Sequence, residues 1–187
     1  LPERPAAPRA RETRPTEQSH LLRGYLAPPL QHADYPALKL ANAVLGSGMS
    51  GRLFRSLRDE AGLAYSVGSF YPTRGQSSRL VVHIGTAPGN LAEAEAGIAR
   101  EIGRLREEAV PEDELTRAKA FVTGGFALDL RTNDRRSFYL AFLELLGAGY
   151  EYVERYPDAI RAVTAADVQR VARRWLVDAA TAVVGPA

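Results

Sequence analysis

The chain has 187 residues, of which 45% are hydrophobic and 25% charged, as in one globular domain or two small units sharing a core. It contains no cysteine, which excludes disulfides, thiolate metal sites and cysteine nucleophiles. The formal net charge of +2 comes from residues 1–15, so the remainder lacks the basic excess that nucleic-acid binders concentrate on one face. No apolar run approaches the roughly 18 residues that a membrane span needs.

Residues 1–16 are rich in proline and lack a hydrophobic period, which predicts a linker or disordered tail leading in from a preceding domain. The chain begins with Leu-Pro-Glu rather than with an initiator methionine, so we expect a piece of a longer protein. The structured domain is predicted to span residues 17–187.

Alternating apolar residues, with many aromatic and β-branched side chains, predict four strands. The first covers residues 19–28 and ends at two prolines. Two more, at residues 63–73 and 78–87, are joined through a short polar turn, and the last covers residues 180–185.

Apolar residues three or four apart predict the helices. Asp34 suits the N-cap of the first helix, and Gly46 stands where a left-handed C′ glycine belongs. Thr164 and Asp167 form a weak capping box for the last helix. The predicted helices cover residues 34–46, a short segment from Ser50 to Arg58, and residues 90–110, 111–130, 134–149 and 164–176.

The order of these elements predicts the fold class. Two strands are adjacent in the middle of the chain and most helices follow them, which is typical of the α+β class. We expect an antiparallel or mixed sheet packed against a group of helices. The regular alternation of strand and helix that builds a doubly wound parallel sheet is not present.

The stretch GSGMSG, residues 46–51, matches the Gly-x-Gly-x-x-Gly spacing of dinucleotide-binding loops. That loop works because a strand leads into a tight turn and the next helix points its N–H groups at a pyrophosphate. Here a predicted helix precedes Gly46, and no Lys-Ser or Lys-Thr follows as in a P-loop. We therefore interpret these glycines as a turn between two helices.

The histidines of the chain are His20, His32 and His83. The helical zinc site of a peptidase needs two histidines one turn apart, with a glutamate beside them that activates water. None of these three has such a partner, so we expect no metal or cofactor site in this chain. No Gly-x-Ser-x-Gly motif supports a serine nucleophile either.

Arg58 and Tyr65 flank the turn from the second helix into the next strand. Each has a structural interpretation, since a cation complements the dipole at a helix end and tyrosine is common in strands. Together they also suit a binding site, because an arginine fork and a neutral hydroxyl can both donate to a peptide carbonyl oxygen. If that carbonyl is attacked, the same donors stabilise the oxyanion. The residues alone leave both interpretations open.

The segment LGSGMSGRLFRSLRDEAGLAYSVGSF, residues 45–70, resembles the signature of the C-terminal domain in pitrilysin/insulinase-type zinc peptidases, the group that includes mitochondrial processing peptidase. The likeness extends upstream to QSHLLRGYLAPPL and DYPALKLANAVLG. It extends downstream to VPEDELTRAKAFVTGGF, VTAADVQRVARRWL and AVVGPA. It covers residues 17–187.

The resemblance implies an enzyme of two homologous halves, each an antiparallel sheet with packed helices. The N-terminal half carries an inverted His-x-x-Glu-His zinc site, and the C-terminal half contributes an arginine and a tyrosine seven residues apart that reach the bound peptide. Arg58 and Tyr65 match that motif, so the resemblance assigns them substrate binding and transition-state support. It implies that this chain contains no catalytic residue, is inactive alone, and has a zinc-bearing half and a peptide substrate as partners.

Alternatives to this assignment stay open. The zinc half belongs either to the same polypeptide or to a separate subunit. Other members of the group have lost activity and serve as inert structural subunits. A homodimer of the isolated domain, formed through the face that meets its mate, is a further alternative. The compartment stays open between the bacterial periplasm and the cytoplasm.

Overall fold

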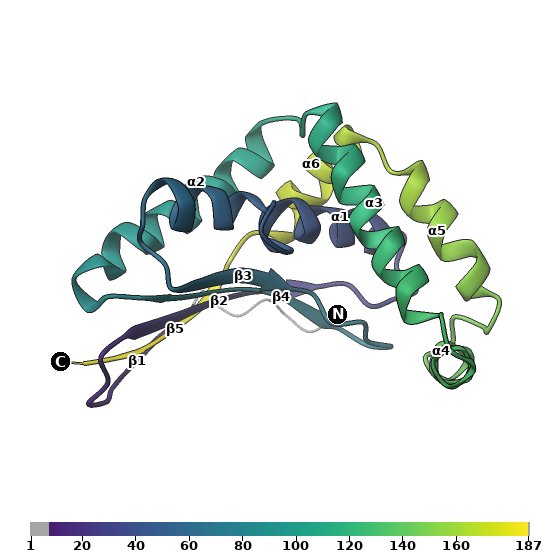
Figure 1. The fold of residues 1–187 in the computed structure, drawn as a ribbon, viewed down its shortest axis with the longest axis horizontal. Coiled ribbons are helices and arrows are strands. Elements are labelled where there is room, and N and C mark those ends of the chain that lie inside the picture. The colour runs from purple at the N-terminus through teal and green to yellow at the C-terminus, as the bar shows by residue number, and fades with distance from the viewer. Residues whose placement is uncertain (1–7, 187) are drawn as a thin grey trace.

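The computed structural model describes residues 8–186. Five strands form one sheet, and helices cover one of its faces, as Figure 1 shows. The elements in chain order are β1 (Arg9–Thr13), β2 (Ser19–Ala27), α1 (Tyr35–Gly46), η1 (Phe54–Glu60), β3 (Ser66–Phe70), β4 (Ser78–Thr86), η2 (Pro88–Asn90), α2 (Leu91–Glu107), α3 (Glu112–Asp129), α4 (Asn133–Leu145), α5 (Tyr152–Ala162), α6 (Ala165–Trp175) and β5 (Ala180–Gly185).

The strand order across the sheet is β1-β5-β2-β4-β3. The central strand β2 pairs antiparallel with both β4 and β5, with Leu22 opposite His83 on one side and Ala182 on the other. β3 pairs antiparallel with β4, whereas β1 runs parallel to β5. The sheet is therefore mixed, and the predicted α+β class is confirmed.

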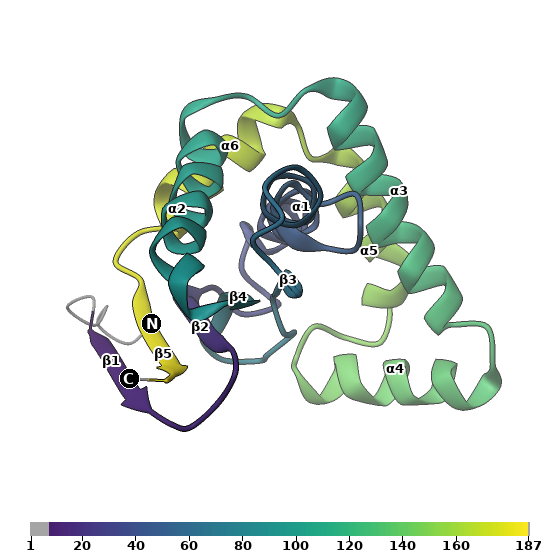
Figure 2. The ribbon, with the colours of Figure 1, turned by 60° about the vertical axis from the view of Figure 1, so that its left-hand side comes forward.

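Strand β4 shows how the sheet builds the core. Leu80, Val82 and Ile84 lie at alternate positions along the strand and are almost completely buried. Arg79, the residue before Leu80, is exposed. Helix α1 lies in the middle of the helical layer, with α2 and α6 on one side and α3 and α5 on the other (Figure 2). Burying one large aliphatic side chain contributes about 1.5–3 kcal/mol, so this face of the sheet holds the helices in place.

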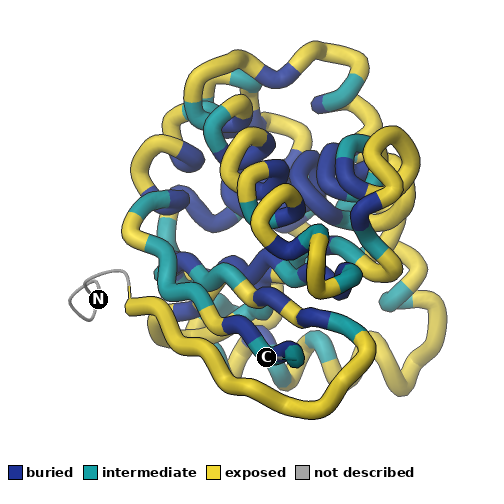
Figure 3. Tube along the Cα trace, turned by 90° about the vertical axis from the view of Figure 1, so that its left-hand side faces the viewer, coloured by how far each residue is buried: buried dark blue, intermediate teal, exposed yellow. Residues whose placement is uncertain are grey.

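The structure corrects the tail predicted for residues 1–16. Arg9–Thr13 form strand β1, which extends the sheet by pairing with β5 near the end of the chain. Arg9 also donates to Glu95 of α2 through two hydrogen bonds of 2.6 and 3.0 Å. All five residues of β1 are exposed (Figure 3), so the strand lacks the hydrophobic alternation that would predict it. Residues 1–7 of the predicted tail lie outside the described residues.

Helix α5 is an element that the sequence pattern did not predict. Pro157 lies inside it, and a proline within a helix removes a backbone donor and clashes with the preceding turn. Tyr156 and Ile160 are nevertheless buried in the core, so tertiary packing outweighs the local preference. The other predicted helices are present, although η1 is wound as a π-helix. The capping box of Thr164 and Asp167 is confirmed.

The carboxylate of Asp34 fastens the start of α1 to α6. Asp34 occupies the predicted N-cap position, but its side chain does not cap α1. Instead it is 3% exposed and accepts hydrogen bonds from Arg170 (2.6 Å), Arg174 (3.1 Å) and Trp175 Nε1 (2.9 Å). Burial raises the pKa of this carboxyl, but the hydrogen bonds and the two arginine charges outweigh burial, so the pKa lies below its ordinary value. Asp34 is therefore charged at neutral pH.

We expect Asp34→Asn to lower the free energy of unfolding by about 2 kcal/mol at neutral pH, because two arginines and the buried Trp175 then face a neutral partner. Since the pKa of Asp34 is lowered by folding, its stabilisation is fully present above the unfolded-state pKa of about 3.9. It is lost as the pH falls through the folded-state pKa. Urea unfolding of both proteins from neutral pH down to about pH 2 measures this. A difference that stays constant over this range would contradict the assignment.

Candidate functional site

The glycine-rich stretch lies where α1, η1 and β3 meet. Gly46 is the last residue of α1, and a Cβ added to it would lie 2.6 Å from the backbone nitrogen of Ser69 in β3. A Cβ added to Gly51 would lie 3.0 Å from the Cα of Gly46. Only glycine fits such short approaches between backbones. The interpretation as a turn after a helix is confirmed, because α1 and not a strand precedes Gly46.

Gly46 does not have the left-handed conformation predicted for a C′ glycine. Helix α1 continues through this residue, and the left-handed angle falls on Gly48, whose φ is +73°. The predicted role of Gly46 is therefore wrong. Its position requires glycine because β3 leaves no space for a side chain, and not because of a backbone angle.

Arg58 belongs to η1, which is anchored by the buried side chain of Leu57. Leu57 is fully buried and occupies the space beside Gly97 of α2, where an added Cβ would collide with it. Arg58 is exposed, and its guanidinium carbon lies 4.8 Å from the centre of the Phe54 ring. The structure of residues 8–186 gives this guanidinium no hydrogen bond and no ion pair. Its donors are therefore available to a ligand.

Tyr65 follows the turn after η1. Gly62 makes this turn with a φ of +63°, and the N–H of Tyr65 donates to the carbonyl of Gly85 in β4 at 2.9 Å. The backbone is thus anchored, while the side chain is 65% exposed and its hydroxyl has no hydrogen bond to any described residue. Tyr65 borders a hollow of about 170 Å³ between this turn and a second segment, formed by Ala87 and Asn90.

The structure places Arg58 and Tyr65 at the two ends of one short connection. The carbonyl of Arg58 accepts the N–H of Gly62 at 3.2 Å, and the N–H of Leu63 returns to the carbonyl of Leu57 at 2.8 Å. This closed turn fixes both backbones. Of the two residues, only Tyr65 borders the hollow, and within the described chain no contact joins the guanidinium to the phenol. They are two separate, exposed donors on the same turn.

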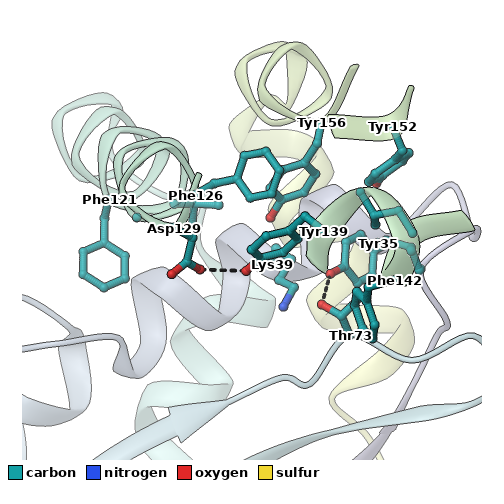
Figure 4. Close-up of a pocket in the computed structure, with 14 residues that line it drawn as sticks. Tyr35, Lys39, Thr73, Phe121, Phe126, Asp129, Tyr139, Phe142, Tyr152 and Tyr156 are labelled. Carbon is teal, nitrogen blue, oxygen red and sulfur yellow. Dashed lines mark hydrogen bonds between the residues drawn. The ribbon is translucent and has the colours of Figure 1, made fainter. Parts of the chain in front are cut away.

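A second concave site, which the sequence analysis missed, lies between α1, α3, α4 and α5 (Figure 4). It encloses about 220 Å³, and Lys39 of α1 is the one basic side chain among the described residues that line it. In the sequence, the apolar side chains that these helices contribute cannot be told from ordinary core residues. The one signal was a lysine inside α1, a helix whose other residues are nearly all buried. The aromatic lining consists of Tyr35, Phe121, Phe126, Tyr139, Phe142, Tyr152 and Tyr156.

The histidines are dispersed over the fold. His20 lies on β2 and His83 on β4, while His32 makes an edge contact with the Trp175 ring at 5.4 Å. Across residues 8–186, no group of three or more histidine, aspartate or glutamate side chains could hold a metal ion. None of the helices described is long and apolar enough to cross a membrane.

Comparison with known proteins identifies the family. Residues 2–122 match the family model described as the peptidase M16 inactive domain. This chain belongs to that family. The resemblance to the non-zinc-binding domain of zinc peptidases is thereby confirmed.

The relatives of this M16 inactive domain are longer proteins. An uncharacterized zinc protease of Bacillus subtilis is 29% identical over 172 residues, which are 91% of this chain and 42% of that protein. An uncharacterized zinc protease of Mycobacterium leprae is 31% identical over 174 residues, 92% of this chain and 39% of that protein. The chain thus spans about two-fifths of the length of these relatives.

Solved structures share the fold of the M16 inactive domain at low sequence identity. The peptidase M16 inactive domain from Pseudomonas fluorescens superimposes with a TM-score of 0.90 at 20% identity, over 100% of this chain and 45% of that chain. A chain of complex III2 from Candida albicans gives a TM-score of 0.81 at 19% identity, over 95% of this chain and 45% of that chain. At these identities the likeness concerns the fold alone.

We expect Gly46→Ala to lower the free energy of unfolding by about 2 kcal/mol, because the added methyl must displace the backbone of β3. Gly103 of α2 is the matched control, since no atom lies within 4 Å of an added Cβ there. Gly103→Ala should raise stability by up to about 1 kcal/mol through helix propensity. Urea unfolding measures both. A stabilising Gly46→Ala would show that the contact with β3 does not constrain this position.

Proposed function

We propose that this M16 inactive domain is the substrate-holding half of a zinc endopeptidase. Arg58 and Tyr65 bind the main chain of an extended peptide, and the zinc site lies on the other half. One observation carries the proposal. The two donors named by the family motif are both exposed and both without a hydrogen-bond partner among the described residues, on a turn whose backbone is fixed.

A structural arginine nearby shows the contrast. Arg52 precedes η1 and is 7% exposed, and it donates to both carboxylate oxygens of Glu114 at 2.9 and 2.6 Å. That pair fastens the start of η1 to α3. Arg58, six residues later, has no such partner within residues 8–186. The π-helical winding of η1 supports a functional role as well, because π-helical turns are rare and frequently occur at functional sites.

The chemistry of the two side chains suits a peptide carbonyl. The arginine supplies a charged fork of donors, and the tyrosine supplies a neutral hydroxyl at the start of β3. β3 is one of the two edge strands of the described sheet, so an extended peptide can also pair with its outer side. Donors fixed in advance stabilise the negative charge that develops on the scissile oxygen during hydrolysis.

Within residues 8–186, no group of histidine and acidic side chains could hold the hydrolytic zinc, which is compatible with a zinc site on the other half. Relatives named zinc proteases are more than twice as long as the matched region, which leaves room for a zinc-bearing half. That half, on the same polypeptide or on a separate subunit, supplies the metal-activated water. The present chain holds the substrate and is inactive alone.

We expect Arg58→Ala and Tyr65→Phe each to lower kcat by about 10²–10³-fold in the assembled two-half enzyme, because each removes one donor to the developing oxyanion. Steady-state cleavage of an unstructured peptide measures this. Matched controls are Arg55→Ala, at another exposed arginine of η1, and Tyr150→Phe, at another exposed tyrosine. Both controls should retain turnover. Unchanged kcat in both site variants would defeat the proposed role.

An inert structural subunit is the second candidate. The observation that favours it is the shared fold with a chain of complex III2 from Candida albicans. In that case the partner protein would carry no His-x-x-Glu-His motif, and Arg58→Ala would leave assembly and every measured activity unchanged. The sequence of the upstream or neighbouring reading frame distinguishes the two candidates.

A further inference from the structure

Lys39 is a cation placed among aromatic rings. It projects from the centre of α1, in which Pro36 and Lys39 are half-buried and all other residues are buried. Its ammonium lies 5.3 Å from the centre of the Tyr35 ring and 5.1 Å from that of Tyr71, and it donates one hydrogen bond, of 2.7 Å, to the carbonyl of Tyr71. An ammonium has three donors, so two of them are not used by described residues.

The acidic side chain in the lining does not neutralise this lysine. Asp129 accepts a hydrogen bond of 2.9 Å from Arg135 and one of 2.7 Å from the hydroxyl of Tyr139, as Figure 4 shows for the tyrosine. No carboxylate of residues 8–186 pairs with Lys39. Burial lowers the pKa of Lys39 to about 8, so the ammonium is poorly solvated yet still mostly protonated at neutral pH.

The rest of the pocket combines apolar walls with neutral donors. The hydroxyls of Tyr152 and Tyr156 make no hydrogen bond to a described residue. Burial raises the pKa of Tyr152 to about 12 and also raises that of Tyr156, so both remain uncharged donors. The volume of about 220 Å³ exceeds the ~150 Å³ of a cavity that holds a benzene molecule. The pocket therefore has room for a ring with a short polar arm.

We propose that this pocket binds a carboxylate attached to an aromatic or branched apolar group, with Lys39 pairing with the carboxylate and the rings enclosing the apolar group. A half-buried cation without an anionic partner among the described residues favours an anion, and aromatic walls favour an apolar body. Two sources share this chemistry: a free aromatic acid and the C-terminal residue of a peptide. The pocket does not include Arg58 or Tyr65, so the proposal does not rest on the proposed peptidase role.

The two lysines of the chain, Lys39 and Lys119, allow a direct test. Lysine labelled with ¹³C at Cε gives one NMR signal for each, assigned with Lys39→Gln. We expect added 3-phenylpropionate to shift the Lys39 signal until the shift saturates. The Lys119 signal should not change, because the Lys119 ammonium donates to the carbonyl of Arg161 outside the pocket. The neutral 3-phenylpropionamide should bind at least about tenfold more weakly than the acid, since it lacks the negative charge.

Two variants on α3 test the location without changing the lysine. Gly125 lines the pocket and Gly124 does not, and an added Cβ meets no atom within 4 Å at either position. We expect Gly125→Leu to abolish binding by filling the pocket and Gly124→Leu to preserve it. Circular dichroism checks that both fold. Equal affinity for acid and amide, parallel shifts of both lysine signals, or unchanged binding to Gly125→Leu would overturn the proposal.

The source of the carboxylate is resolved with peptide-like probes. N-acetyl-phenylalanine has the carboxylate of a peptide C-terminus, and N-acetyl-phenylalaninamide lacks it. If peptides are the source, the first should shift Lys39 at least as strongly as 3-phenylpropionate, and the second should not. If only the free acid binds, the proposal holds for small aromatic acids. Absence of binding by both carboxylates would refute it.

Discussion

The direct backbone contact between Gly46 of α1 and Ser69 of β3 is the constraint on which the candidate site depends. Without a Cβ at Gly46, the last turn of α1 rests on the edge strand, and Gly51 brings the chain back against the same point. From this point the chain continues through η1 and the turn at Gly62 into β3. Arg58 lies on that path, so its position follows from the glycines that precede it.

Helix α1 connects this contact to the rest of the molecule. At its start, Asp34 accepts hydrogen bonds from α6, and at its end, Gly46 meets β3. Between the two, Lys39 is directed into the aromatic pocket formed with α3, α4 and α5. A helix held at both ends by close contacts is rigid, and a rigid helix can hold a lysine in a poorly solvated position. The same element thus organises two separate concave sites.

Sequence reasoning succeeded where the signal is local. The alternation in β4 and the apolar spacing of α1 predicted those elements, and an ordered motif predicted the family. It failed where an element or site is stabilised by residues far away in the sequence. Strand β1 is fully exposed and exists because β5 offers it hydrogen bonds, and α5 contains Pro157 but is stabilised by packing. The pocket around Lys39 was also missed, because its walls come from four helices that no local pattern brings together. The binding role of Arg58 and Tyr65 stays a prediction, and the free donors of both side chains became visible only with the fold.

The most direct test of the central claim is a crystal structure of both halves assembled with an uncleaved peptide, the water-activating glutamate of the zinc-bearing half having been replaced. The account predicts that the Arg58 guanidinium and the Tyr65 hydroxyl each lie about 2.7–3.1 Å from a main-chain oxygen of that peptide. A bound peptide that leaves both side chains in solvent would contradict it.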